Sequence, residues 1–141
     1  MSDTELGRYS QMMEQRAWES YERTNRLYHI APVNNIARIA VGGLNAGTTV
    51  NIDGAKHPAI WFFTDKDWAG DVAGSIGMGE FALFSIRKAA VKRDLVRWDN
   101  VAELCAGVSF YCLKERIPPS YITFIGAYTL KINTNAHTIT V

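Results

Sequence analysis

The sequence predicts a single α+β domain. Apolar residues recur at three- and four-residue spacing over residues 3–24, which predicts one N-terminal helix. Short runs of β-branched and aromatic residues, bounded by turn-forming residues, gather in the second half of the chain. A length of 141 residues matches one domain with one core, so we expect helices and strands to occupy separate parts of one fold.

The N-terminal helix is predicted by an apolar stripe and by its start. Ser2 and Glu5 have the spacing of a capping box. We expect the stripe to pack on the rest of the domain and the charged residues between to face water. The stripe consists of Leu6, Tyr9, Met13, Ala17 and Tyr21.

A strand followed directly by a helix is predicted next. Residues 27–30 are a short strand candidate, and Pro32 stands at a favoured first helical position. Gly42-Gly43 ends this helix by permitting a left-handed cap. Residues 44–58 are rich in Gly, Asn and Thr and lack helical periodicity. We expect them to form a long loop with at most one edge strand, of the kind that often covers a binding site.

Strands and short connections fill the rest of the chain. Residues 59–63 are predicted to be a buried strand, and Thr64 to Asp67 resemble the cap and first turn of a short helix over residues 68–73. Glycine-rich residues 74–79 lead to a strand at 81–86, with further strands at 108–113 and 121–132. Residues 134–136 are expected to turn a last hairpin.

Composition excludes several classes of protein. The chain carries 15 Lys and Arg against 14 Asp and Glu, a net charge of +1, which argues against a broad basic surface. Cys105 and Cys112 are too few for a disulfide scaffold or a four-cysteine zinc site, so we expect two buried thiols in a reduced compartment. Without a signal-peptide pattern or a run of about 20 apolar residues, we expect a cytoplasmic protein away from membranes.

His29 is the histidine with the most informative surroundings. His29, His57 and His137 lack metal-ligand spacing, so we expect no metal. No Gly-x-Ser-x-Gly elbow or phosphate loop is present. His29 ends a strand and is followed at once by a helix start, which places an imidazole beside free amides and suits a nucleotide or other anion. A histidine that only bonds neighbouring backbone is the structural alternative.

The run LYHIAPVNNIARIAVGGL resembles the opening of the ADP-ribosyltransferase superfamily. It is most similar to DNA ADP-ribosylating toxins of toxin–antitoxin systems and to tRNA 2'-phosphotransferases. In the toxins a strand bearing H-I-x-x-h-x-N-h, where h is apolar, precedes I-x-x-x-G-L. The matching positions here are His29, Ile30, Val33, Asn35, Ile36, Ile39, Gly43 and Leu44.

Two later segments extend this resemblance over residues 27–125. Residues 60–65 are similar to the superfamily's apolar strand that ends in Ser or Thr before a helix. Residues 108–113 and 117–122 look like its late strand and its h-P-P-x-Y-I turn. The resemblance implies a split antiparallel β core at 27–125 with short flanking helices. The helix and the hairpin predicted from the local patterns complete the single domain, with the N-terminal helix at 1–26 and the C-terminal hairpin at 126–141.

The resemblance also implies an NAD+ site and a reaction. His29 is implied to bind the adenosine ribose with Asn35 near the cofactor, Tyr28 and Phe63 to pack at the nicotinamide, and Thr64 to bond its ribose. The nicotinamide–ribose bond weakens and an acceptor nucleophile attacks the oxocarbenium-like ribose, which a carboxylate normally stabilises. One small domain with this activity is typical of a toxin or a phage-encoded effector.

The sequence departs from the toxins at this carboxylate. Their glutamate stands eight residues before the first proline of the late turn, where this chain has Phe110. Glu103, ahead of the late strand, is the first catalytic candidate, and Glu115, beyond it, is the second. The Arg-His-Gly opening of the phosphotransferases is absent too, since Tyr28 precedes His29. The 2'-phosphotransferase reaction is therefore not favoured.

A basic run follows the central strand and is the candidate contact for a nucleic acid or protein acceptor. Solvated surface charge is the alternative interpretation of this run. Two alternatives also remain for the whole protein: a non-catalytic module that sequesters an NAD-derived nucleotide or blocks a partner, and an interaction domain whose N-terminal helix mediates homo-oligomerisation. The basic residues are Arg87, Lys88, Lys92, Arg93 and Arg97.

Overall fold

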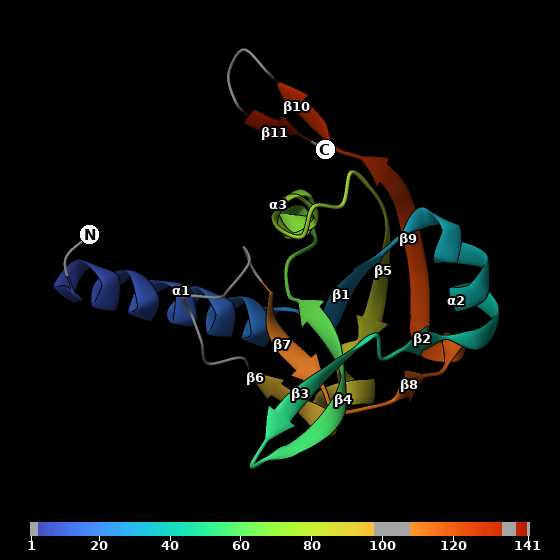
Figure 1. The fold of residues 1–141 in the computed structure, drawn as a ribbon, viewed down its shortest axis with the longest axis horizontal. Helices are drawn as coiled ribbons and strands as arrows, with labels where there is room; N and C mark the ends of the chain where they lie inside the picture. Colours follow the sequence, from blue (N-terminus) through green and yellow to red (C-terminus); the bar gives the residue numbers. More distant parts are fainter. Residues whose placement is uncertain (1–2, 98–107, 134–137, 141) are drawn as a thin grey trace.

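The computed structural model describes residues 3–97, 108–133 and 138–140 (Figure 1). The helices are α1 (Asp3–Arg23), α2 (Ile36–Gly42), α3 (Ala69–Ser75) and α4 (Lys88–Val91), and the short 3-10 turns are η1 (Val33–Asn35), η2 (Lys66–Trp68), η3 (Lys92–Asp94) and η5 (Pro119–Tyr121). The strands are β1 (Arg26–Ala31), β2 (Leu44–Asn45), β3 (Thr48–Ile52), β4 (Ala55–Phe63), β5 (Glu80–Arg87), β6 (Leu95–Arg97), β7 (Val108–Cys112), β8 (Arg116–Ile117), β9 (Ile122–Thr129), β10 (Lys131–Asn133) and β11 (Thr138–Thr140).

One antiparallel sheet organises the fold. Its strands lie in the order β6-β7-β4-β1-β5-β9, and β3 joins through β4 to make a seven-stranded sheet. Two smaller antiparallel pairs, β2 with β8 and β10 with β11, complete the described strands. The predicted α+β class is therefore confirmed.

The local signals around β1 and β4 predict the observed elements. β1 covers the expected strand, and α2 ends at Gly42 and is capped by Gly43, whose φ of 82° lies in the left-handed region. Asp65 caps the turn after β4, because its Oδ1 accepts a hydrogen bond of 2.9 Å from the Asp67 amide. The expected cap and short helix after residue 64 are thus confirmed.

The prediction of a long loop at residues 44–58 is wrong. This segment contains β2, β3 and the start of β4, and β3 pairs with β4 from Thr48↔Ala59 to Ile52↔Ala55. The turn is made by Asp53 and Gly54, with φ of 51° and 84°. A two-residue turn with both φ positive matches the twist of a hairpin, and Asp-Gly favours it. β3 and β4 therefore form a hairpin in place of the expected loop.

α1 extends away from the sheet and meets the core at its C-terminal end (Figure 1). Among the predicted stripe residues, Tyr21 packs against the core. Lys88 holds this end, because its Nζ donates a hydrogen bond of 2.7 Å to the Tyr21 carbonyl and lies 4.3 Å from the centre of the Tyr21 ring. No helix in the described part of the chain has the length and apolar character needed to cross a membrane.

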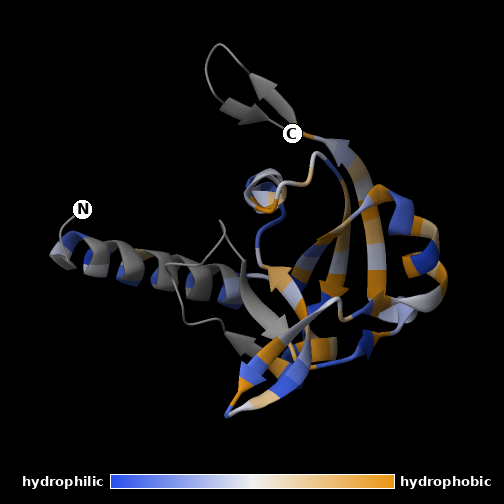
Figure 2. Cartoon of the chain, viewed as in Figure 1, coloured by the Kyte–Doolittle hydropathy of each residue, from blue (hydrophilic) through white to orange (hydrophobic). Residues whose placement is uncertain are grey.

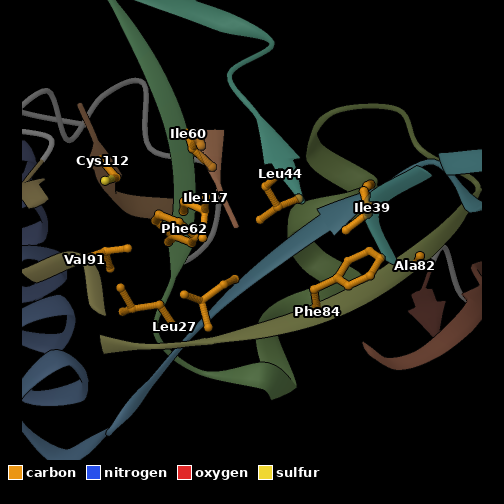
Figure 3. Packing of buried hydrophobic residues seen from close by; sticks show 12 residues of the cluster. Leu27, Ile39, Leu44, Ile60, Phe62, Ala82, Phe84, Val91, Cys112 and Ile117 are labelled. Atoms are coloured by element: carbon orange, nitrogen blue, oxygen red, sulfur yellow. The ribbon is translucent and has the colours of Figure 1, made fainter. Parts of the chain in front are cut away.

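Buried residues cover both faces of the sheet. Along β1, Leu27 and Ala31 belong to one core cluster and Ile30 belongs to the other, as alternation in a strand requires. In the first cluster, Phe62 of β4 lies beside Ile117 of β8 (Figure 3). α3 supplies the second cluster with small side chains such as Ala73. A site on one face of the sheet therefore has different neighbouring side chains from a site on the other face.

Cys112 belongs to the first cluster and is fully buried. Desolvation, and next the charge of Asp94, raise the pKa of its thiol to about 11. The expectation of a buried thiol is confirmed for Cys112, while Cys105 lies outside the described residues. At neutral pH the Cys112 thiol is protonated and thus a poor nucleophile.

β9 lies within the strand expected at residues 121–132. β9 pairs with β5 as far as Thr129↔Glu80, so the core sheet continues past residue 125 and the hairpin of β10 and β11 begins at Lys131.

β4 changes along its length from hydrophilic residues, near its turn with β3, to apolar residues within the sheet (Figure 2). Apolar character along β4 therefore marks the part that enters the core.

Candidate functional site

The sheet opens between β1 and β4. Every residue of β1 from Arg26 to Ala31 has a partner on β5. Only Tyr28 has a partner on β4, which is Phe63. Beyond this pair the two strands diverge, so the seven-stranded sheet consists of two parts joined at one point. A cleft lies where the strands separate.

A cavity of about 220 Å³ occupies this cleft. Its walls come from the end of β1, the middle of β4, the segment from η1 to α2, and the residues from β2 to the start of β3. The polar side chains that line it belong to His29, Asn35, Arg38, Asn45 and Thr48. The structure thus brings two predicted site residues, His29 and Asn35, to one cavity.

His29 bridges the gap between the diverging strands. Its Nδ1 lies 2.8 Å from the carbonyl oxygen of Trp61. A carbonyl oxygen only accepts hydrogen bonds, so Nδ1 carries the proton and donates it. In the neutral ring Nε2 then has a lone pair and is a hydrogen-bond acceptor. The contact fixes both the orientation and the tautomer of the imidazole.

Burial keeps this imidazole neutral. Removal from water lowers the pKa of His29 below its ordinary value of 6.5, and the hydrogen bond to Trp61 opposes this effect. The edge of the ring packs against Phe62 at a centroid distance of 6.1 Å. At neutral pH His29 therefore offers the cavity an acceptor for a hydroxyl hydrogen instead of a positive charge.

The lowered pKa predicts that acid destabilises the fold through His29. The unfolded chain protonates this histidine as the pH falls through about 6.5, whereas the folded protein resists protonation until lower pH. The stabilisation is complete above that pH and is lost as the pH falls toward the folded pKa. We expect the free energy of unfolding, measured by urea denaturation, to fall more between about pH 7.5 and about pH 5.5 in wild type than in His29→Gln. Equal losses would contradict the assigned burial.

Both the backbone and the side chain of Trp61 form hydrogen bonds. Its carbonyl bonds His29, and its indole Nε1 donates a hydrogen bond of 2.9 Å to Thr48 Oγ1. Thr48 Oγ1 in turn donates 3.1 Å to the Ala59 carbonyl. These bonds connect the β3–β4 hairpin to the histidine and hold the cavity wall in place.

Arg38 is a cavity residue that the sequence interpretation missed. Asn35 and Arg38 are three residues apart, and Ile39 follows, so all three lie on one face of the segment that leads into α2. Arg38 is exposed, and its guanidinium supplies a permanent positive charge at the cavity. The helical spacing from Asn35 is the signal that identifies it.

Tyr28, Phe63 and Thr64 do not line this cavity. The rings of Tyr28 and Phe63 lie 5.9 Å apart, and both residues pack in the cluster that includes Ile30 and α3. This is the sheet face opposite to that of His29, because residues alternate along β1. Thr64 follows β4 directly and is 2% exposed.

The structure describes one of the two candidate carboxylates, Glu115. Glu103 lies outside the described residues. Glu115 is exposed between β7 and β8, and its carbonyl accepts a hydrogen bond of 2.9 Å from the Ala46 amide, next to the cavity residue Asn45. Phe110 pairs with Phe62 in the register of β7 and β4. Among the described residues, no carboxylate lines the cavity.

The basic run begins at Arg87, the last residue of β5, and continues through α4, η3 and β6; it shares no residue with this cavity. Among the described residues, no group of three or more His, Cys, Asp or Glu side chains is placed to hold a metal ion.

Comparisons of the chain with family models, with curated proteins and with solved structures found no match.

Proposed function

We propose that the cleft at His29 binds NAD+ and that the protein transfers ADP-ribose to a macromolecular acceptor. The observation that carries this proposal is the neutral His29, held by the Trp61 carbonyl with Nε2 available as an acceptor. A ribose hydroxyl donates well to such a nitrogen. The resemblance of residues 27–44 to ADP-ribosyltransferases supports the same role.

The size and charge of the cavity support one part of a dinucleotide as its occupant. Its 220 Å³ is below the roughly 300–1,000 Å³ typical of sites that enclose a whole ligand. We place the adenosine ribose at His29 and Asn35, with Arg38 toward the phosphates. We place the remainder of NAD+ along the gap between β1 and β4. This gap ends where Tyr28 pairs with Phe63.

The proposed reaction breaks the bond between nicotinamide and the ribose carbon. Nicotinamide leaves with the bonding electrons, which neutralise its ring charge. The acceptor nucleophile forms the new bond to that carbon and releases one proton. A carboxylate near the ribose would stabilise the oxocarbenium-like charge. Glu103 is the first candidate for this role and Glu115 the second.

A non-catalytic role is the second candidate. Phe110 stands where the related toxins carry their glutamate, and no described carboxylate lines the cavity. A pocket with the binding groups and without the carboxylate would sequester an NAD-derived nucleotide. This alternative predicts tight binding without turnover.

An assay with NAD+ labelled in both nicotinamide and adenylate, incubated with host-cell lysate, tests the two functions. We expect wild type to release nicotinamide and to label an acceptor, Glu103→Gln to lose both, and Glu115→Gln to retain them. Binding of NAD+ without release would favour the sequestering module. Absence of binding by wild type would refute both candidates.

A further inference from the structure

We propose that β9 pairs edge to edge with β9 of a second copy of this chain and so forms a two-fold symmetric dimer. β9 is the last strand in the order of the main sheet, and among the described strands it pairs with β5 alone (Figure 1). Its other edge carries the alternate backbone N–H and C=O groups that point away from β5. Such an edge is a template for pairing with another chain.

Exposed apolar side chains gather on this strand. Six of the eight β9 residues are exposed, whereas the six central residues of its neighbour β5 are buried. In the described part of the chain seven large hydrophobic side chains are exposed, and four of them belong to η5 or β9. Those four are Tyr121, Phe124, Ile125 and Tyr128, with exposed fractions of 45, 46, 37 and 37%. Apolar clusters on a protein surface mark sites of interaction.

The edge of β9 lacks the charges and prolines that normally prevent pairing of this kind. Residues 121–130 contain no Lys, Arg, Asp, Glu or Pro, although charged residues make up 21% of the chain. Charged side chains and proline are common protection for a long edge strand. The strand at the opposite end of the sheet differs, because β6 has three residues and Arg97 is one of them. Of these two ends of the sheet, β9 is therefore the one open to pairing.

A second copy of β9 is the occupant that these features favour. A two-fold axis perpendicular to the sheet makes the two β9 strands antiparallel, which continues the antiparallel pairing inside the main sheet. Neutral side chains of one strand then face neutral side chains of the other, without the repulsion that identical charges would cause. Pairing of β9 with β6 of another copy would be head-to-tail and would leave a free edge at each end.

The surface of β9 is large enough for a weak dimer. Eight residues at roughly 3.4 Å each give an edge about 27 Å long. The rings of Tyr121, Phe124 and Tyr128 expose about 250 Å² per copy, since a whole aromatic side chain presents about 200 Å². With a comparable area from the backbone edge, the two copies bury about 1,000 Å², the lower limit for a specific interface. The dimer should therefore depend on protein concentration.

Ile125 lies at the middle of β9 and thus close to the proposed axis. The register of β9 with β5 skips Ile125, between Phe124 and Gly126. An axis at the middle of the strand pairs the largest number of residues and brings the two Ile125 positions together, where facing Cβ atoms are about 5 Å apart. β9 shares no residue with the cavity at His29, so the proposed dimer and the proposed NAD+ site are tested separately.

Sedimentation velocity of the full chain without NAD+, at protein concentrations from about 1 to about 200 µM, tests the dimer. Ile125→Lys brings two lysines together at the axis, so we expect the dimer Kd to rise at least about tenfold. Ile125→Glu should weaken the dimer in the same way. An equimolar mixture of the two variants should dimerise again, because opposite charges then face each other. This rescue excludes a variant that merely misfolds.

Ile76→Lys is the matched control, because it makes the same change at a position that is 53% exposed and lies outside β9. We expect its dimer Kd to equal that of wild type, and the β9 amides of wild type to exchange hydrogen more slowly at high protein concentration. A monomeric wild type at every concentration would leave the edge to a strand of another protein and overturn the proposal. Equal weakening by Ile125→Lys and Ile76→Lys, a mixture that stays monomeric, or assemblies that grow beyond a dimer would also overturn it.

Discussion

Replacing Gly43 with alanine is expected to lower the free energy of unfolding by about 3 kcal/mol or more. Gly43 has a φ of 82°, a conformation that costs other residues roughly 1–2 kcal/mol. A Cβ at this position would also collide with the backbone carbonyl of Ile117. Relief of that collision would require β8 to move away from β2, because Ile117 pairs with Leu44.

Gly42→Ala is the matched control for this prediction. Gly42 ends α2 in an ordinary conformation, and a Cβ there has no atom within 4 Å. Alanine is a better helix former than glycine by up to about 1 kcal/mol, so we expect unchanged or slightly higher stability. Urea denaturation followed by circular dichroism measures both variants. A loss of less than about 1 kcal/mol in Gly43→Ala would contradict the close approach of α2 and β8.

The second large effect is expected from His29→Phe on NAD+ binding. Phenylalanine keeps an aromatic ring against Phe62 and removes both nitrogens. Loss of the Nε2 acceptor leaves a ribose hydroxyl unpaired, and loss of Nδ1 leaves the Trp61 carbonyl without its partner. Unsatisfied groups of this kind cost about 1–3 kcal/mol each, so we expect Kd to rise at least about tenfold by calorimetry.

His57→Phe serves as the control for the same measurement. His57 pairs with Val50 in the β3–β4 hairpin and does not line the cavity. We expect its Kd for NAD+ to equal that of wild type. Equal weakening in both variants would indicate a general loss of structure, and no weakening in His29→Phe would place NAD+ elsewhere.

Local signals account for the elements that the sequence predicts well. β1, α2 and the cap at Asp65 depend on neighbouring residues, such as Pro32 before a helix and Gly43 after it. The β3–β4 hairpin has an equally local signal, Asp53-Gly54, which the high Gly, Asn and Thr content obscured. Turn chemistry therefore predicts the structure of this segment better than its composition does.

The cleft itself depends on contacts between distant segments. The place of His29 before a helix start marks it as a candidate, but its partner Trp61 lies in another strand. The register of β1 with its neighbours decides which face of the sheet Tyr28 and Phe63 occupy. Local periodicity does not specify this register.

Titration of NAD+ into protein labelled with nitrogen-15 at histidine tests the central claim most directly. The ring nitrogens of His29 are assigned by their absence in His29→Phe. We predict that Nδ1 of His29 stays protonated while its Nε2 resonance shifts toward that of a hydrogen-bonded acceptor, with His57 unchanged. If NAD+ at saturating concentration leaves the Nε2 resonance of His29 in place, the cleft is not the NAD+ site.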